Sequence, residues 1–229
     1  MNDHKKYVRF LWLMIMITTA LLSSVIMLFE WTSLDLTIQD HFYNFQTGNW
    51  IIDRHNSLWD LFFYTGPKLL YIGFGVFCLA KVIFTPKSKQ PVRDRYFKVC
   101  LSLALVPLTI SGIKKISNIY TPAQTDRYGG EYLHVKLFEQ YPADFAPDKP
   151  GHGWPAGHAS GGFSLMALYY FFTKKTHRFY GLLIGLGAGW LTGLYQTLNG
   201  QHYISHTIVT MLMAWILINT IELILQHKT

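Results

Sequence analysis

The sequence is poor in charged residues. Only 14% of its 229 residues are Asp, Glu, Lys or Arg, whereas soluble domains carry about 25%. Half of the residues are hydrophobic and 16% are aromatic. This balance argues against a soluble protein and indicates an integral membrane protein.

Cysteine is scarce as well. The two cysteines, Cys78 and Cys100, both fall inside apolar segments. We therefore expect small core residues there and neither a disulfide nor a metal pair. The sequence also lacks internal repeats, low-complexity tracts and a soluble second domain. It predicts a single integral-membrane domain over residues 1–229.

What the sequence has instead is six apolar stretches, each close to the roughly 20 residues that span a bilayer. The fourth is the weakest, because three glycines crowd its start. The first is too long for the core of a signal peptide and is followed by a poor cleavage site, so we expect a retained helix. The pattern predicts an all-α, polytopic membrane helix bundle with six transmembrane helices, at about Phe10–Phe29, Phe63–Phe84, Phe97–Ile113, Ser160–Phe172, Phe179–Leu198 and Ile204–Leu225.

Basic residues gather before the first apolar stretch and in the connections at 81–98 and 174–178. Positively charged loops stay in the cytoplasm, so both termini are predicted to be cytoplasmic. The long connection at 114–157 is then predicted to form an ordered cap on the outer side, between helices 3 and 4. The net charge of +7 is divided among these short loops, which argues against nucleic-acid binding.

His158 follows Pro155-Ala156-Gly157 where the fourth helix is predicted to begin. Backbone N–H groups at a helix N-terminus that a glycine opens form an anion site. A histidine at this place can donate a proton to a departing oxygen. His158 and Gly157 are therefore candidates for a site that handles a phosphate.

His202 and His206 lie four residues apart where the sixth helix begins, which places both on one helical face. One ring can accept the N–H of the other and fix its tautomer, the pairing of a nucleophile with an orienting residue. The same spacing also suits zinc. A zinc hydrolase with His152, His158, His202 and His206 as ligands is an alternative, although the motif lacks a glutamate base.

Lys114 and Lys115 end the third apolar stretch on the predicted outer side, where basic residues are not expected. Two interpretations are open. Lysines at this depth can extend to the interface as anchors, or they can bind the oxygens of a substrate phosphate.

Together these motifs resemble the type 2 phosphatidic acid phosphatase family, integral-membrane lipid phosphatases related to the vanadium haloperoxidases. The family pattern is Lys-x6-Arg-Pro, Pro-Ser-Gly-His and Ser-Arg-x5-His-x3-Asp. This chain has Lys114-x6-Thr121-Pro122, Pro155-Ala156-Gly157-His158 and Tyr195-Gln196-x5-His202-x3-His206. Order and spacing match, and the six-helix bacterial members are the most similar.

The resemblance implies a metal-free and cofactor-free phosphohistidine mechanism. His202 would be the nucleophile, His158 the general acid, and His206 would stand where the family has its aspartate. Two family arginines are replaced by Thr121 and Gln196. The phosphate-binding residues that the resemblance then implies are Lys114, Gln196, Gly157 and Arg127, with Lys115 as a further cation.

The implied substrate is a phosphorylated lipid at the outer face of the bacterial inner membrane, such as undecaprenyl pyrophosphate, a lipid A phosphate or phosphatidylglycerol phosphate. Two alternatives share the same residues. One is a catalytically weakened member that binds or transports lipid phosphates, and the other is a phosphotransferase that passes phosphate from lipid to lipid.

Overall fold

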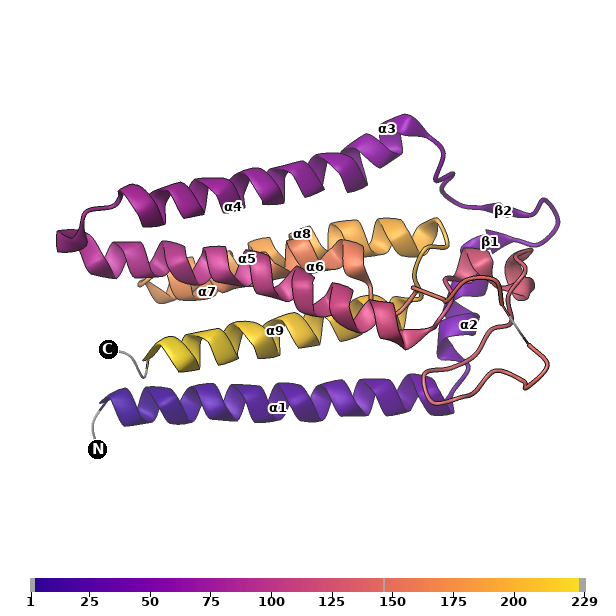
Figure 1. The fold of residues 1–229 in the computed structure, drawn as a ribbon, viewed down its shortest axis with the longest axis horizontal. Coiled ribbons are helices and arrows are strands. Elements are labelled where there is room, and N and C mark those ends of the chain that lie inside the picture. Colours follow the sequence, from indigo (N-terminus) through magenta and orange to yellow (C-terminus); the bar gives the residue numbers. More distant parts are fainter. Residues whose placement is uncertain (1–2, 146, 227–229) are drawn as a thin grey trace.

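The computed structural model describes residues 3–145 and 147–226, so the outermost ends of the predicted domain lie outside the described residues. The described chain is almost entirely helical and forms a bundle of long rods with both ends of the chain at the same side (Figure 1). The prediction of an all-α membrane bundle is confirmed. Its main helices are α1 (Asp3–Trp31), α4 (Gly66–Phe84), α5 (Gln90–Ser117), α6 (Gly157–Ser164), α7 (Leu168–Phe171), α8 (Lys175–Leu198) and α9 (Ile204–Gln226).

Within the described residues, four segments are long and apolar enough to cross a membrane, namely Asp3–Trp31, Ser57–Phe84, Lys87–Gln124 and Ile204–Gln226. The predicted fourth and fifth stretches are helical but more polar. The fourth is broken by the 3-10 turn η5 (Leu165–Ala167) between α6 and α7. α6 and α7 pack in the middle of the bundle and are largely buried, whereas α8 buries its glycine-rich face and exposes Leu183, Ile184, Leu191 and Leu194.

Glycine explains how α6 and α8 pack so closely. A Cβ atom on Gly162 of α6 would lie 2.5 Å from the backbone of Ala188 in α8, and one on Gly181 would lie 2.7 Å from the backbone of Leu168. Small residues let helix backbones approach in membranes, where packing rather than the hydrophobic effect holds helices together. These glycines also weaken the hydropathy signal of the two central segments.

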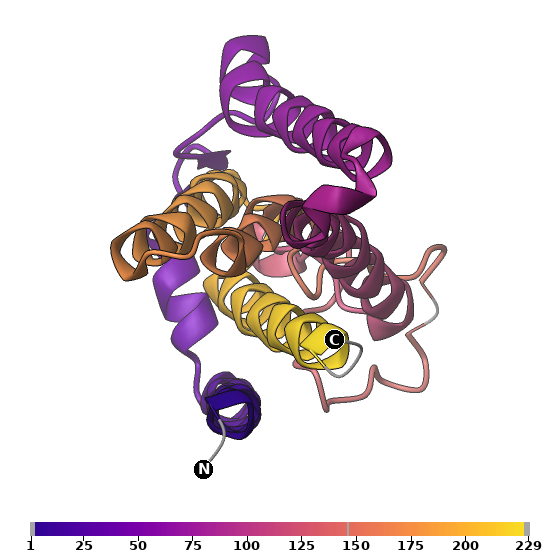
Figure 2. The same ribbon diagram turned by 90° about the vertical axis from the view of Figure 1, so that its left-hand side faces the viewer.

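The outer helices are arranged unevenly around this centre. α1 packs along α9, whereas α4 packs mainly on α5 and diverges from the remaining helices (Figure 2). α4 is preceded by α3 (Ser57–Asp60) and by the π-helical turn η1 (Leu61–Thr65). Gly66 permits this turn, because a Cβ atom there would lie 2.5 Å from the carbonyl oxygen of Leu61.

The cap at the end opposite the termini has two parts. One is the predicted connection after α5, which contains the short turns η3 (Pro122–Gln124) and η4 (Asp126–Tyr128). The other was not predicted: α2 (Leu34–Asp40) and a hairpin of β1 (Tyr43–Asn44) and β2 (Asn49–Trp50). The rings of Tyr43, Trp50 and Tyr128 pack together and join the two parts.

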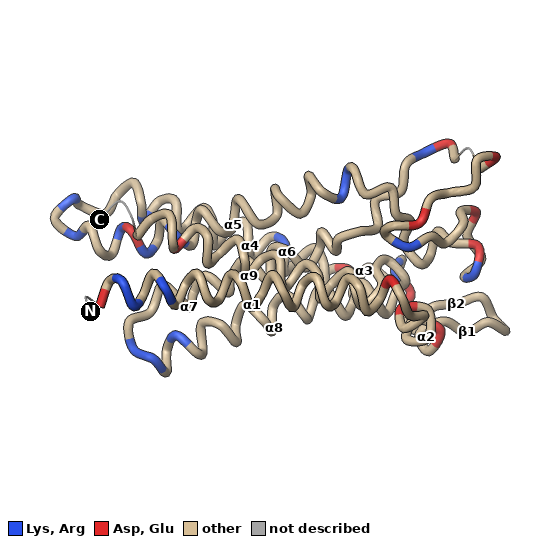
Figure 3. Tube along the Cα trace, turned by 90° about the horizontal axis from the view of Figure 1, so that it is seen from below, with Lys and Arg blue, Asp and Glu red and all other residues tan. Residues whose placement is uncertain are grey.

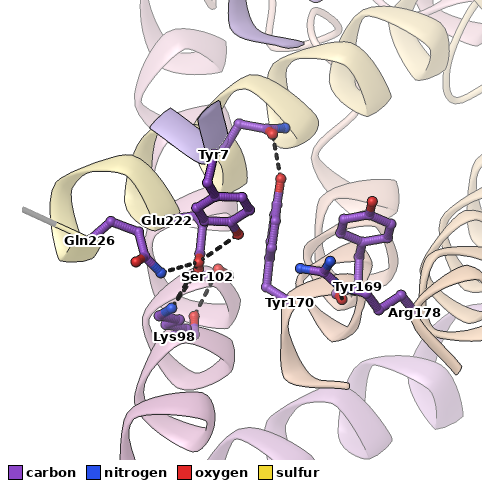
Figure 4. A network of polar contacts seen from close by, with 9 residues as sticks. Tyr7, Lys98, Ser102, Tyr169, Tyr170, Arg178, Glu222 and Gln226 are labelled. Carbon is purple, nitrogen blue, oxygen red and sulfur yellow. Dashed lines mark hydrogen bonds and ion pairs between the residues drawn. The ribbon is translucent and has the colours of Figure 1, made fainter. Parts of the chain in front are cut away.

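The other end of the bundle is held by a polar network around Glu222 of α9 (Figure 4). The Glu222 carboxylate accepts hydrogen bonds from Tyr7 of α1 at 2.9 Å and from Lys98 of α5, with which it forms an ion pair at 2.8 Å. One turn earlier, Asn219 accepts a 2.6 Å hydrogen bond from Tyr170 of α7. Because a buried charge is costly without its partner, this network fixes how four helices meet.

Charge is distributed along the bundle as the sequence pattern indicates. Lys and Arg collect at the end that holds both termini, the middle is nearly free of charge, and the cap carries both signs (Figure 3). The two ends of the bundle therefore differ in charge, with the excess of basic residues at the end that holds both termini.

Candidate active site

His202 lies in the turn between α8 and α9, beneath the cap. Gly200 adopts φ = 77° in this turn and packs against the Trp50 ring, and the amide of His202 donates to the Gln196 carbonyl at 3.1 Å. The side chain is 1% exposed. Its Nδ1 lies 2.8 Å from the carbonyl oxygen of Gly153. A carbonyl only accepts, so Nδ1 carries the proton and Nε2 is left with its lone pair.

His158, the second residue of α6, meets that lone pair. Its Nδ1 lies 3.2 Å from Nε2 of His202. With Nε2 as acceptor, His158 donates its Nδ1–H. The edge of the Tyr64 ring packs against His158, with 4.9 Å between ring centroids. The structure thus brings together the two histidines that the sequence assigns to nucleophile and acid, from segments 44 positions apart.

His206 lies beside this pair, but the predicted ring-to-ring hydrogen bond is wrong. Nδ1 of His206 is 2.9 Å from the same Gly153 carbonyl that His202 uses, and the two ring centroids are 5.9 Å apart. The backbone therefore orients both imidazoles. Gly153 is held against the backbone of Tyr120, where a Cβ atom would come within 2.7 Å, so a side chain at this position would displace the shared acceptor.

Burial has a clear effect on the charge of His202. Desolvation, together with the nearby His158 and Lys114, lowers the pKa of His202 well below the ordinary histidine value. The ring is therefore neutral at physiological pH, as a nitrogen nucleophile has to be.

A cavity of about 600 Å³ between α4, α5 and α6 opens on His158, the first histidine of the pair. Its end near the cap is polar and includes His158, Gly157, Lys114 and Lys68. A Cβ atom on Gly157 would lie 3.6 Å from Nζ of Lys114, which places the ammonium group at the N-terminus of α6. The rest of the cavity follows α4 and α5 away from the cap and is mainly apolar, with Ile72, Val76, Leu79, Leu103 and Pro107 in its lining.

Three of the predicted phosphate-binding residues, Arg127, Lys115 and Gln196, are not part of the cavity lining. Arg127 forms a two-pronged contact with Asp40 in the cap, at 2.9 and 2.5 Å, which raises the arginine pKa and lowers that of Asp40. Lys115 points to an exposed face of α5. Gln196 is buried and its backbone carbonyl holds the His202 turn. Its contribution seen here is therefore to position the loop.

Lys68 and Tyr64 are the site residues that sequence reasoning missed. Tyr64 lies in the π-helical turn η1 and Lys68 in the first turn of α4, and both line the cavity with His158. In the sequence Lys68 is an isolated lysine outside the three motifs. The sequence could have indicated both residues through their spacing, because Lys68 follows Tyr64 by four residues. This spacing places both side chains on one face of a helix at the membrane edge.

The zinc alternative finds little support in the donor geometry. Across residues 3–145 and 147–226, no three His, Cys, Asp or Glu side chains are grouped so that they could hold a metal ion. His152 is exposed, and its Nδ1 lies 3.3 Å from the backbone carbonyl of Lys114.

Comparisons with known proteins agree with this geometry. A family model described as PAP2 superfamily matches residues 95–229, more than half of the chain and the part that contains all three motifs. No curated protein and no solved structure matches the chain.

Proposed function

The chain belongs to the PAP2 superfamily, and from this we propose that it is a lipid phosphatase that forms a phosphohistidine on His202. Membership of the family implies phosphatase-type activity on phosphate esters, and the apolar helices make a membrane protein. The observation that carries the more specific proposal is the cavity that ends at His158 and Lys114 and continues as an apolar groove along α4 and α5.

The shape of this cavity favours a lipid over a soluble phosphate ester. A headgroup phosphate placed near His158 would meet Lys114 and the amides at the start of α6, where an anion is stabilised. The attached hydrocarbon would lie against the apolar lining at bilayer depth. Undecaprenyl pyrophosphate, a lipid A phosphate and phosphatidylglycerol phosphate all combine these two parts.

The proposed reaction has two steps. The bound phosphate stabilises His158 as an imidazolium. Nε2 of His202 attacks phosphorus in line, the bond to the lipid oxygen breaks, and the His158 imidazolium donates a proton to that oxygen and becomes neutral. Water then attacks the phosphohistidine while His158 accepts its proton, and inorganic phosphate leaves. Reacting atoms need a separation of about 3–3.5 Å. The 3.2 Å contact between the two imidazoles must therefore open to admit the phosphoryl group.

We further propose that the site faces the periplasm, at the outer face of the bacterial inner membrane. The support is the charge distribution. The basic end of the bundle holds both termini, and the site lies at the other end beneath the cap (Figure 3). Basic loops are retained in the cytoplasm.

The proposed function can be tested by measuring phosphate release from a panel of lipid phosphates and pyrophosphates by the detergent-purified protein in excess EDTA. We expect release that EDTA leaves unchanged. Release that depends on added metal would indicate a metalloenzyme. Transfer of phosphate to an acceptor lipid without release would indicate a phosphotransferase, and binding without either reaction would indicate a lipid-phosphate binder.

The Gly153 carbonyl leads to a prediction for His206. In His206→Ala the carbonyl loses one donor and His202 loses a neighbour that restricts its ring, so we expect kcat/KM to fall about tenfold. His206→Asn places an amide N–H close to the former Nδ1–H and should retain most activity. If both variants lose activity equally on the same lipid phosphate, the hydrogen bond to Gly153 is not what matters.

A further inference from the structure

Lys68 of α4 occupies a place that the three motifs leave unassigned. It lies in the first turn of the helix, four residues after Tyr64, and both side chains line the cavity that contains His158 and Lys114. α4 contributes none of the motif residues, and it packs mainly on α5 (Figure 2). Lys68 thus adds a cation to the site from a helix that contains no motif residue.

Distances connect Lys68 to the reacting groups through Tyr64. The Tyr64 ring packs with its edge on His158, with 4.9 Å between centroids, and Nζ of Lys68 lies 5.8 Å from the Tyr64 centroid. Nζ of Lys114 lies beside Gly157, the residue before His158. Both lysines therefore line the same cavity as the general acid.

The negative charge of a phosphate substrate makes a second cation at this site important for binding. A phosphate monoester carries close to two negative charges, and phosphoryl transfer depends largely on groups that neutralise its equatorial oxygens. Thr121 and Gln196 stand where the family has arginines, Arg127 is paired with Asp40, and Lys115 is exposed. Among the described residues no carboxylate lies within ion-pair distance of Lys68, so its charge is available to a ligand.

We propose that Lys68 binds the substrate phosphate together with Lys114, and that this pair of lysines replaces the two missing arginines. Tyr64 positions both the ammonium group and the His158 ring. The inference rests on the proposed function, since it assigns a residue to the same site. A lysine that only anchors α4 at the membrane interface would show the same exposure but would not affect phosphate binding.

The test compares Lys68→Gln, Lys68→Arg and Lys115→Gln with the parent protein. Lys115 is the matched control because it is an exposed lysine at the same end of the bundle. Two quantities are measured, kcat/KM on a lipid phosphate and the rise in Tm that orthovanadate, a phosphate mimic, causes in the purified protein. The second needs no turnover, because a ligand that binds the folded state stabilises it.

We expect Lys68→Gln to lower kcat/KM about 10- to 100-fold and to lose most of the vanadate-induced rise in Tm. Lys68→Arg should keep both largely intact, and Lys115→Gln should match the parent. If Lys68→Gln behaves like Lys115→Gln in both measurements, Lys68 is only an anchor and the inference is wrong. If the parent itself releases no phosphate but binds vanadate through Lys68, the proposed reaction fails while this site stands.

Discussion

Replacing His202 with alanine is expected to abolish turnover and leave the bundle folded. The variant loses an imidazole whose Nδ1–H donates to the Gly153 carbonyl at 2.8 Å and whose Nε2 lies 3.2 Å from Nδ1 of His158. Removing a covalent nucleophile costs a factor on the order of 10⁶ in kcat. Acid-labile, alkali-stable phosphate on the quenched parent enzyme should disappear in the variant.

The matched control for this experiment is His152→Ala. His152 lies on the same side of the membrane but is exposed, so its loss should leave the rate within a few-fold of the parent. If His202→Ala kept a phosphoenzyme of the same stability, another residue would have to be the nucleophile.

The lowered pKa of His202 adds a pH signature to this prediction. Burial favours its neutral ring in the folded protein, whereas an unfolded histidine titrates near 6.5. Below that pH the unfolded chain binds the additional proton, so the folded state loses stability as the pH falls. His202→Ala should therefore be less destabilised by acid than the parent. The nucleophile itself should stay neutral at pH values where an exposed histidine is already charged.

The sequence predicts the long helices well because lipid imposes a strong rule. A segment that crosses the bilayer has to satisfy its backbone internally and be apolar on the outside, so α1, α4, α5 and α9 are visible as apolar runs. In the centre of the bundle, close packing between helices matters more than contact with lipid. Gly162, Gly181 and their neighbours allow close helix packing, and these glycines lower the hydropathy of α6 and α8 although α8 exposes an apolar face.

The site could be predicted only in part, for a similar reason. His158 and His202 are found by their motifs, since adjacency to a helix start is a local property. The orientation of His206 is not local, because a carbonyl from the cap, Gly153, enters between the helices and accepts from both rings. The position of the Arg127 side chain is set by its contact with Asp40, which lies 87 positions earlier in the sequence. The spacing of residues in the sequence therefore predicts neither contact.

The second large effect is expected for His158→Ala. In the resting site His158 is neutral, because burial and the nearby Lys114 and Lys68 lower its pKa to about 4, and its Nδ1–H donates to His202. The negative charge of a bound phosphate raises this pKa, and the imidazolium that then forms supplies the proton that the departing lipid oxygen needs. An alkoxide is a poor leaving group, so losing this proton should slow release from a lipid phosphate by about 100- to 10,000-fold, the range for general acid–base catalysis.

The leaving group separates this chemical role from a structural one. An aryl phosphate such as p-nitrophenyl phosphate departs as a stable phenolate and scarcely needs the proton, so its phosphorylation step should slow much less in His158→Ala. His158 also acts as base in the second step, which makes the burst of nitrophenol, rather than the steady state, the quantity to measure. A large burst that survives the substitution supports the general acid. Equal losses on both substrates would mean that His158 holds the His202 ring in place and that the proton comes from elsewhere.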